Sequence, residues 1–243
     1  MTIDSAIIIL AAGQGKRMRS TLPKPLVPVA GRPIIDHLID AVRESGIQTI
    51  SVVVGHQADR MRDHLDDSIL TPLQVVRNGT AHAVDVAKDT VKDADEVFVF
   101  VGDSPLISRS SIERLQRVHR ETGSACSFLT ADFGQHYPYA RVIRDENGDV
   151  RAVIEERDCT AEQTEITEYL TSHFLFDAQA LWSVLGRVET HAVTGERYLT
   201  DTIGLLLAEG RRVQAVSIED WRELVGLNTP EDVAWAEGVL AGS

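Results

Sequence analysis

The stretch "AIIILAAGQGKRM", residues 6–18, contains the strongest fold signal in the chain. Residues 6–10 are apolar at every position, which is typical of a strand buried on both faces of a parallel sheet. Small residues and the glycines Gly13 and Gly15 follow directly. The segment after this strand gathers cations, although the whole chain is acidic: Lys16, Arg17, Arg19, Lys24 and Arg32. The sequence therefore predicts a buried strand that leads into a basic, glycine-containing loop.

Length and composition limit the kinds of protein this can be. The 243 residues are 43% hydrophobic and 25% charged, which is ordinary for a globular protein with a substantial core. A net charge of −13 argues against a nucleic-acid partner, because phosphate backbones select basic surfaces. Any anion that binds here should be small and held at one local site.

Cysteine use and hydropathy indicate the compartment. Cys126 and Cys159 have no metal-like spacing and fit a reducing environment. The first residues, MTIDS, lack the basic region of a signal peptide. The longest apolar run, residues 6–12, is far shorter than the ~20 residues that a transmembrane helix needs. We expect a cytoplasmic protein with no membrane partner, and the sequence leaves its oligomeric state open.

Apolar spacing predicts alternating strands and helices in the first half of the chain. After the strand at 6–10, helices are expected at residues 33–42, 59–65, 81–91 and 108–121, and strands at 48–54, 73–76 and 97–101. Such alternation produces a parallel sheet that is covered on both faces. The prediction is an α/β fold with a Rossmann-like, mostly parallel sheet.

The second half is richer in strands. They are expected at residues 125–131, 140–144, 150–155, 166–176 and 213–216, with helices at 177–185 and 198–209. Asn147-Gly148 is a hairpin signal, and Thr229 followed by Pro230 predicts the start of a last helix. Because no repeat or linker interrupts the chain, we expect a smaller β-rich lobe on the same sheet.

Two familiar phosphate-binding loops do not fit the basic segment. A Walker A loop would need a glycine where Leu10 stands and a serine or threonine where Arg17 stands. A dinucleotide fingerprint would need a glycine in place of Met18. The remaining pattern still lets backbone N–H groups approach a ligand, while Arg17 and Lys24 supply charge for a polyphosphate. The alternative is a flexible surface loop with solvated cations.

The segments "LAAGQGKRM" (residues 10–18) and "LPKPL" (residues 22–26) resemble the sugar-1-phosphate nucleotidyltransferases. The chain is most similar to the uridylyltransferase domain of the bacterial N-acetylglucosamine-1-phosphate uridylyltransferases. This resemblance covers nearly the whole chain and implies the nucleotide-diphospho-sugar transferase fold: one domain over residues 1–243, with a nucleotide-binding half to about 123 and a sugar-binding half from about 124. Bifunctional members continue into a β-helix acetyltransferase domain. No hexapeptide repeat occurs here, so we expect only the nucleotidyltransferase half.

The resemblance implies a set of residues that bind UTP. In the loop they are Leu10, Ala11, Ala12, Gly13, Gly15 and Lys24. Gln74 and the segment Gly79-Thr80 resemble the part of the family that reads uracil, and an amide can donate and accept at once, as the N3–H and O4 edge requires. The fit is imperfect because Ala81 stands where the family usually has glycine. A strand-edge glutamine and a simple helix cap are the alternatives, and we interpret His82 as structural.

Asp103 follows a predicted buried strand, at the edge of the sheet where ligands of open α/β folds bind. Mg²⁺ commonly takes one or two protein ligands together with phosphates and waters. The resemblance makes Asp103 a metal ligand with Asn228 as its partner, and it gives Arg17, Lys24 and Asp103 catalytic roles. The alternatives are a turn or helix-start acid for Asp103 and a turn residue for Asn228.

The sugar side departs from the family pattern. Glu155 matches the sugar-binding glutamate, although an exposed glutamate at a strand end is the common alternative. Ala140 replaces a glycine near the sugar, Leu170 replaces an asparagine, and Val101 replaces a tyrosine. The segment at residues 196–201 also resembles the family, and we interpret it as structural support.

These observations together imply a metal-assisted substitution. The phosphate of a sugar 1-phosphate attacks the α-phosphorus of UTP, and pyrophosphate leaves. The acceptor is N-acetylglucosamine 1-phosphate or a related hexose phosphate. Alternatives are another nucleoside triphosphate, a cyclitol or cofactor-precursor phosphate, or a non-catalytic sugar-nucleotide sensor. The presence of both Lys24 and Asp103 argues against the sensor, which could lose either residue and still bind.

Overall fold

The computed structural model describes residues 4–242. Residues 1–3 and Ser243 lie outside the described residues. Residues 1–3 are part of the segment MTIDS, for which no signal peptide was expected. Within residues 4–242, no helix has the length and hydropathy that a membrane crossing requires.

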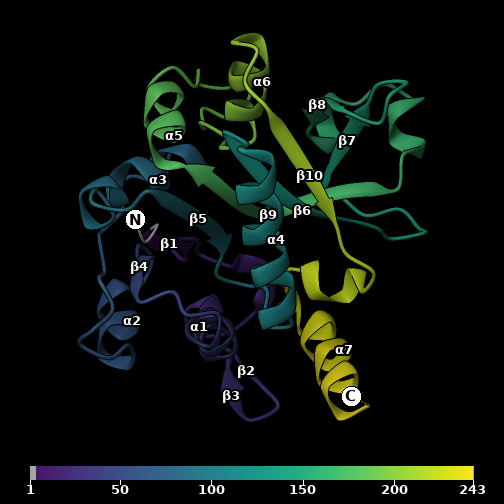
Figure 1. The fold of residues 1–243 in the computed structure, drawn as a ribbon. Helices are drawn as coiled ribbons and strands as arrows, with labels where there is room; N and C mark the ends of the chain where they lie inside the picture. The colour runs from purple at the N-terminus through teal and green to yellow at the C-terminus, as the bar shows by residue number, and fades with distance from the viewer. Residues whose placement is uncertain (1–3, 243) are drawn as a thin grey trace.

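Eight strands form one sheet that runs through the molecule (Figure 1). They are β1 (Ser5–Leu10), β4 (Thr49–Val53), β5 (Glu96–Val101), β6 (Cys126–Asp132), β7 (Ala140–Arg144), β8 (Val150–Ile154), β9 (Glu168–Asp177) and β10 (Val213–Ser217). Their order is β10-β6-β9-β5-β1-β4, with β7 paired to β9 and β8 to β7. Two short strands, β2 (Pro28–Val29) and β3 (Arg32–Pro33), form a separate ribbon. Strands from both halves of the chain thus share the main sheet.

Most neighbours in the six-strand run are parallel. β1 is parallel to β4 and β5, and β10 is parallel to β6, whereas β9 is antiparallel to both β5 and β6. This arrangement confirms the predicted mixed α/β fold with a mostly parallel sheet. The hairpin predicted at Asn147-Gly148 joins β7 to β8, and Gly148 has a φ of 85° at the turn.

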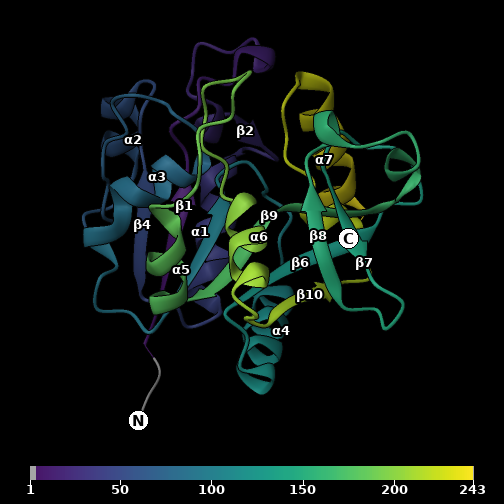
Figure 2. The same cartoon turned by 90° about the horizontal axis from the view of Figure 1, so that it is seen from above.

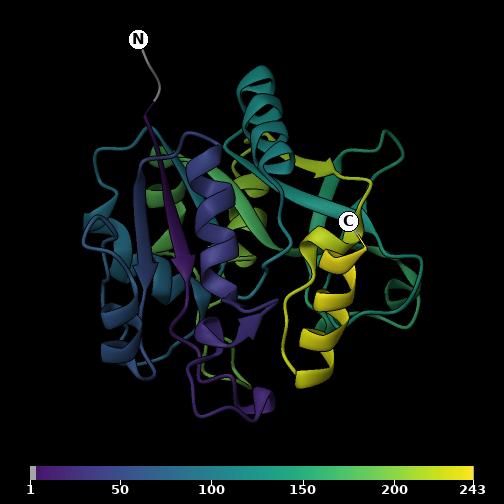
Figure 3. The ribbon, with the colours of Figure 1, turned by 90° about the horizontal axis from the view of Figure 1, so that it is seen from below.

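Helices cover both faces of this sheet. They are α1 (Ile34–Glu44), α2 (Ala58–His64), α3 (Thr80–Ala87), α4 (Arg109–Thr122), α5 (Ala178–Leu185), α6 (Asp201–Ala208) and α7 (Pro230–Ala241). Figure 3 shows α1, α4 and α7 on one side, and Figure 2 shows α3, α5 and α6 on the other. The predicted covering of both faces is therefore confirmed.

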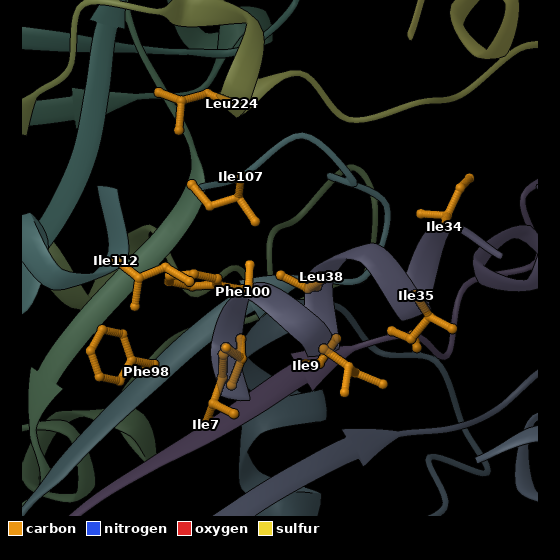
Figure 4. Packing of buried hydrophobic residues seen from close by; sticks show 14 of the residues in the cluster. Ile7, Ile9, Ile34, Ile35, Leu38, Phe98, Phe100, Ile107, Ile112 and Leu224 are labelled. Carbon is orange, nitrogen blue, oxygen red and sulfur yellow. The ribbon is translucent and has the colours of Figure 1, made fainter. Parts of the chain in front are cut away.

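The central strands are apolar throughout because each face of the sheet has its own core. Ile7 and Ile9 of β1 pack with Phe98 and Phe100 of β5 and with Leu38 of α1 (Figure 4). The residues between them belong to the core on the other face: Ala6, Ile8, Val97 and Val99. All of these side chains are fully buried, which explains why the strand signals read as continuous apolar runs.

Two predicted elements differ from the structure. The strand expected at residues 73–76 is reduced to one isolated bridge between Leu73 and Val54, and Val75 is 79% exposed. The segment runs past the edge strand β4 without a second partner, so its apolar residues never enter the core. The helix expected from residue 198 begins at Asp201, with Thr200 as its N-cap residue, and the preceding N–H of Leu199 donates to the Thr80 hydroxyl.

Candidate active site

The candidate site lies where the strand order reverses. β4 lies on one side of β1 and β5 on the other, and the crevice beyond the carboxyl ends at such a point is where α/β sheets bind ligands. Leu10 and Val101 are paired at the ends of β1 and β5, and the N–H of Gly102 donates to the Leu10 carbonyl at 2.9 Å. Three neighbouring hollows meet here, and Asp103 lines all of them.

The first hollow is formed by the basic loop and has a volume of about 280 Å³. Its lining includes Leu10, Ala11, Gly13, Gly15, Lys16, Arg17, Lys24, Asp103 and Asn228. Gly15 has a φ of 59°, and a Cβ at this position would lie 2.6 Å from the Cβ of Lys24. Only glycine therefore allows Lys24 to fold back beneath the loop. Met18 is 4% exposed and anchors the loop in the core.

The predicted catalytic and metal-binding residues form one polar network in this hollow. The Lys24 ammonium donates to the Asp103 carboxylate and, at 2.8 Å, to Oδ1 of Asn228. Arg17 donates to the same Oδ1 at 2.9 Å. The side chains of Lys24 and Asp103 are 13% and 21% exposed, so this ion pair is largely shielded from solvent. The fold brings together four residues that come from three distant parts of the chain.

The start of α7 holds Asn228 in place. The predicted Thr229 cap is present: its hydroxyl accepts from the N–H of Asp232, and the Asp232 carboxylate accepts from the N–H groups of Thr229 and Asn228. The N–H of Leu227 donates to the Asp103 carbonyl at 2.9 Å. A helix cap and one backbone bond thus fix the amide beside the carboxylate.

The donor chemistry at this point fits Mg²⁺. Asp103 and Asn228 offer a carboxylate and an amide oxygen, which are hard donors, and both already bind the same cationic group. Among residues 4–242 no group of three His, Cys, Asp or Glu side chains is arranged to hold a metal. Two protein oxygens suffice for Mg²⁺, which keeps several waters and takes its other oxygens from substrate phosphates.

The second hollow, of about 260 Å³, lies over the Gln74 amide. Its lining includes Leu10, Ala12, Gly13, Gln74, Arg77, Gly79, Thr80, Glu196 and Tyr198. Gln74 is 4% exposed, and its Nε2 donates to the Gly79 carbonyl at 3.1 Å and lies 3.0 Å from Nδ1 of His82. Because both hydrogens of the amide nitrogen are directed at protein acceptors, Oε1 is left to accept a hydrogen bond from a ligand, and the simultaneous donation expected from the sequence is not available in this arrangement.

The segment at residues 195–200 closes the rim of this hollow. Gly79 has a φ of 92°, and a Cβ there would collide with the backbone of Arg197. The N–H of Ala81 donates to the Arg197 carbonyl at 3.0 Å. The predicted supporting segment therefore also contributes to the wall, through Glu196 and Tyr198. Arg77 in the same wall had no signal in the sequence beyond its position between Gln74 and Gly79.

The third hollow contains the residues expected to bind the sugar and has a volume of about 150 Å³. Glu155 accepts a hydrogen bond of 2.7 Å from the buried Thr200 hydroxyl. Ala140 and Leu170 are paired between β7 and β9 and are 4% and 2% exposed, so they form an apolar floor together with Val101.

Several polar residues of the third hollow were missed from the sequence. Thr171 lies 3.0 Å from Nδ1 of His173, which is fully buried. Burial lowers the pKa of His173 to about 4, so the imidazole is neutral. The Tyr139 hydroxyl accepts from the N–H of Gly226, and burial raises the pKa of this phenol. Tyr139 and Thr171 flank the substituted positions Ala140 and Leu170, which was the signal that could have identified them.

Comparison with known proteins fits this geometry. Residues 7–184 match the MobA-like NTP transferase domain. The bifunctional protein GlmU of Clostridium beijerinckii is 38% identical, and that of Bacillus cereus (strain G9842) is 37% identical, each over 96% of this chain and 51% of the relative. The chain thus spans about half the length of the curated relatives it matches.

A solved structure shares the fold. The crystal structure of a putative glucose-1-phosphate thymidylyltransferase from Bacillus anthracis, in complex with a sucrose, has a TM-score of 0.80 and 18% identity, and the match covers 97% of this chain and 94% of that one. The family expectation drawn from the loop is confirmed: this chain is a nucleotidyltransferase that belongs to the MobA-like NTP transferase domain family.

Proposed function

We propose that this protein transfers UMP from UTP to a sugar 1-phosphate and releases pyrophosphate. The observation that carries the proposal is the network of Arg17, Lys24, Asp103 and Asn228, at the meeting point of hollows suited to a triphosphate, a base and a small acceptor. The GlmU relatives and the structural neighbour named for glucose 1-phosphate support the same class of reaction.

In the proposed reaction the bonds form and break between the two substrates, and the protein forms no covalent bond to either of them. An oxygen of the acceptor phosphate forms a bond to the α-phosphorus, and the bond between that phosphorus and the oxygen of the departing pyrophosphate breaks. Because the attacking phosphate is already anionic, no general base and no covalent enzyme intermediate are required. Positioning and neutralisation of charge supply most of the rate.

Each member of the network has a role in that scheme. Arg17 binds the β- and γ-phosphates, and Lys24 binds the phosphates at the reacting centre. Asp103 and Asn228 hold Mg²⁺, the proposed cofactor. When bound, Mg²⁺ neutralises negative charge on the phosphate oxygens. The loop from Leu10 to Gly15 places backbone groups against the nucleotide.

We infer further that residues 1–243 act as one nucleotidyltransferase domain in the cytoplasm. The shared eight-stranded sheet supports a single unit. Cys126 and Cys159 are both free thiols, which is consistent with a reducing compartment.

The base preference follows from the orientation of Gln74. Its free Oε1 can accept from the N3–H of uracil, whereas N3 of cytosine carries no hydrogen. We expect UTP to be preferred over CTP for this reason, and over GTP because Gln74 and Gly79-Thr80 resemble the segment that reads uracil in the related enzymes; each preference in kcat/KM should be the ~1–3 kcal/mol that a well-made base contact contributes elsewhere. A pyrophosphate-release screen of nucleoside triphosphates against sugar 1-phosphates measures this preference directly.

Two variants sharpen that screen. Gln74→Ala should reduce the preference for UTP, while Gln214→Ala on the distant strand β10 serves as the matched control and should leave it intact. If GTP or CTP is used at least as efficiently as UTP under matched conditions, the assignment of the base site is wrong. If no triphosphate and no acceptor yields pyrophosphate, the proposed reaction itself is wrong.

The acceptor is a separate prediction, motivated by the apolar floor of Val101, Ala140 and Leu170. Leu170 cannot make the hydrogen bonds of the asparagine that the related enzymes have there, and each lost contact costs about 1–3 kcal/mol. We therefore expect N-acetylglucosamine 1-phosphate to be a poor or non-exclusive substrate, with another hexose 1-phosphate or a cyclitol phosphate preferred.

Values of kcat/KM across acceptors test this, first in the native chain and then in Leu170→Asn. The variant should shift the preference toward N-acetylglucosamine 1-phosphate, and a thermal melt shows whether its fold is retained. Native use of that acceptor at least about tenfold better than every other would mean that the three departures do not set specificity.

A further inference from the structure

We propose that the Lys24 ammonium occupies the cation position of this site until a triphosphate binds, so that the free protein has low affinity for a divalent metal and acquires the metal together with its nucleotide. The inference rests on the assignment of Asp103 and Asn228 as metal ligands in the proposed function. It concerns what those oxygens do before substrate arrives.

Without nucleotide, Lys24 already contacts both predicted metal ligands. One ammonium group donates to both oxygens that would hold the metal, the Asp103 carboxylate and Oδ1 of Asn228. Oδ1 also accepts from Arg17 at 2.9 Å. A carbonyl oxygen has two acceptor sites, so in this state both sites of the Asn228 amide are already used.

The positive charges at this oxygen oppose the entry of a divalent cation. The ammonium and guanidinium groups meet at the same oxygen, and Lys24 is only 13% exposed, so solvent screens them incompletely. A divalent cation would have to enter against both positive charges. The aliphatic part of the Lys24 side chain also packs closely against Gly15.

A triphosphate can reverse this arrangement. Its oxygens carry more negative charge than an amide oxygen, so they form stronger hydrogen bonds with Lys24 and Arg17. When these two side chains turn to the phosphates, Asp103 and Asn228 are released. The phosphates also supply the further oxygens that Mg²⁺ requires beyond two protein ligands. Lys24 thereby couples metal affinity to the presence of nucleotide.

The test measures Mn²⁺ binding to the full chain without nucleotide, by loss of the electron paramagnetic resonance signal of free Mn²⁺. Lys24→Met keeps most of the side-chain volume and removes the charge. We expect it to bind Mn²⁺ at least about tenfold more tightly than the native protein, because a tethered competitor at high local concentration is removed. Lys92→Met replaces an exposed lysine that lines none of the three hollows; it is the matched control and should bind as the native protein does.

Further variants and a fold check separate the outcomes. The tighter binding of Lys24→Met should be lost in the double variant that adds Asp103→Asn, and thermal melts establish that each protein is folded. If the native protein binds Mn²⁺ as tightly as Lys24→Met, and Asp103→Asn abolishes that binding, the competition is overturned while the proposed function stands. If Lys24→Met does not bind Mn²⁺ and pyrophosphate release continues in excess chelator, the assignment of Asp103 and Asn228 as metal ligands is wrong. This inference, which depends on that assignment, is then wrong as well.

Discussion

Replacing Asp103 by alanine is expected to lower kcat for pyrophosphate release by ~10²-fold or more, and Lys24→Ala should have an effect of the same size. Both side chains lie in the one network where the three hollows meet. In the proposed mechanism both charges are in place before the reaction begins, and loss of such preorganised charge is most damaging in the transition state. Initial rates at saturating substrates, with a coupled pyrophosphate assay, measure the loss.

The controls are residues of the same charge outside this network. Asp67→Ala and Lys92→Ala remove an exposed carboxylate and an exposed ammonium that line none of the three hollows, and neither should change kcat appreciably. Excess chelator should also stop the native enzyme. Full activity of Asp103→Ala, or full activity in chelator, is incompatible with the proposed mechanism.

Arg141→Met is expected to lower the free energy of unfolding by about 3–5 kcal/mol. The Arg141 side chain is fully buried and lies 4.7 Å from the centre of the Tyr169 ring. It donates to the carbonyls of Tyr137 and Tyr139 and pairs with Glu156. Methionine fills much of the volume but leaves these acceptors without a donor, and buried polar groups are costly when unpaired.

Urea unfolding of the native protein and the variant gives this difference. Arg144→Met in the same strand is the matched control, since Arg144 pairs with Glu168 while 30% exposed, and we expect a loss of about 1 kcal/mol or less. Because Tyr139 lines the third hollow, where we propose that the acceptor binds, any folded Arg141→Met should also have a raised KM for the acceptor. Equal losses for the two arginines would show that burial of Arg141 contributes nothing.

Local pattern determined much of the fold. Residues 6–10 and 97–101 are apolar at successive positions because each strand is buried on both faces. Burial on both faces is therefore visible in the sequence as an uninterrupted apolar run. The last helix was predictable for a similar reason: Thr229 and Pro230 act within one turn of the chain. The basic loop was conspicuous because its cations stand beside glycines in an acidic protein. The same loop, residues 10–18 and 22–26, also carries the resemblance to the nucleotidyltransferase family.

Longer-range features needed the tertiary structure. The Leu73–Val76 run has strand-like composition, yet it lies past the edge strand with one bridge, because pairing depends on a partner that composition does not reveal. Arg141 lies in the strand predicted at residues 140–144, but its complete burial depends on the loop around Tyr139 and on Glu156, which pack against it.

The candidate site divides in the same way. The sequence by itself determined that a basic, glycine-containing loop follows the first strand and predicted that it binds phosphate, and it identified Lys24, Asp103 and Asn228 as separate candidates. Only the tertiary structure decided that one ammonium contacts both predicted metal ligands, and that Gln74 is oriented by Gly79 and His82. The physical reason is range: helix caps and strand periodicity act between near neighbours in the chain, whereas hydrogen bonds and charges act between atoms that only the complete fold brings within about 3 Å.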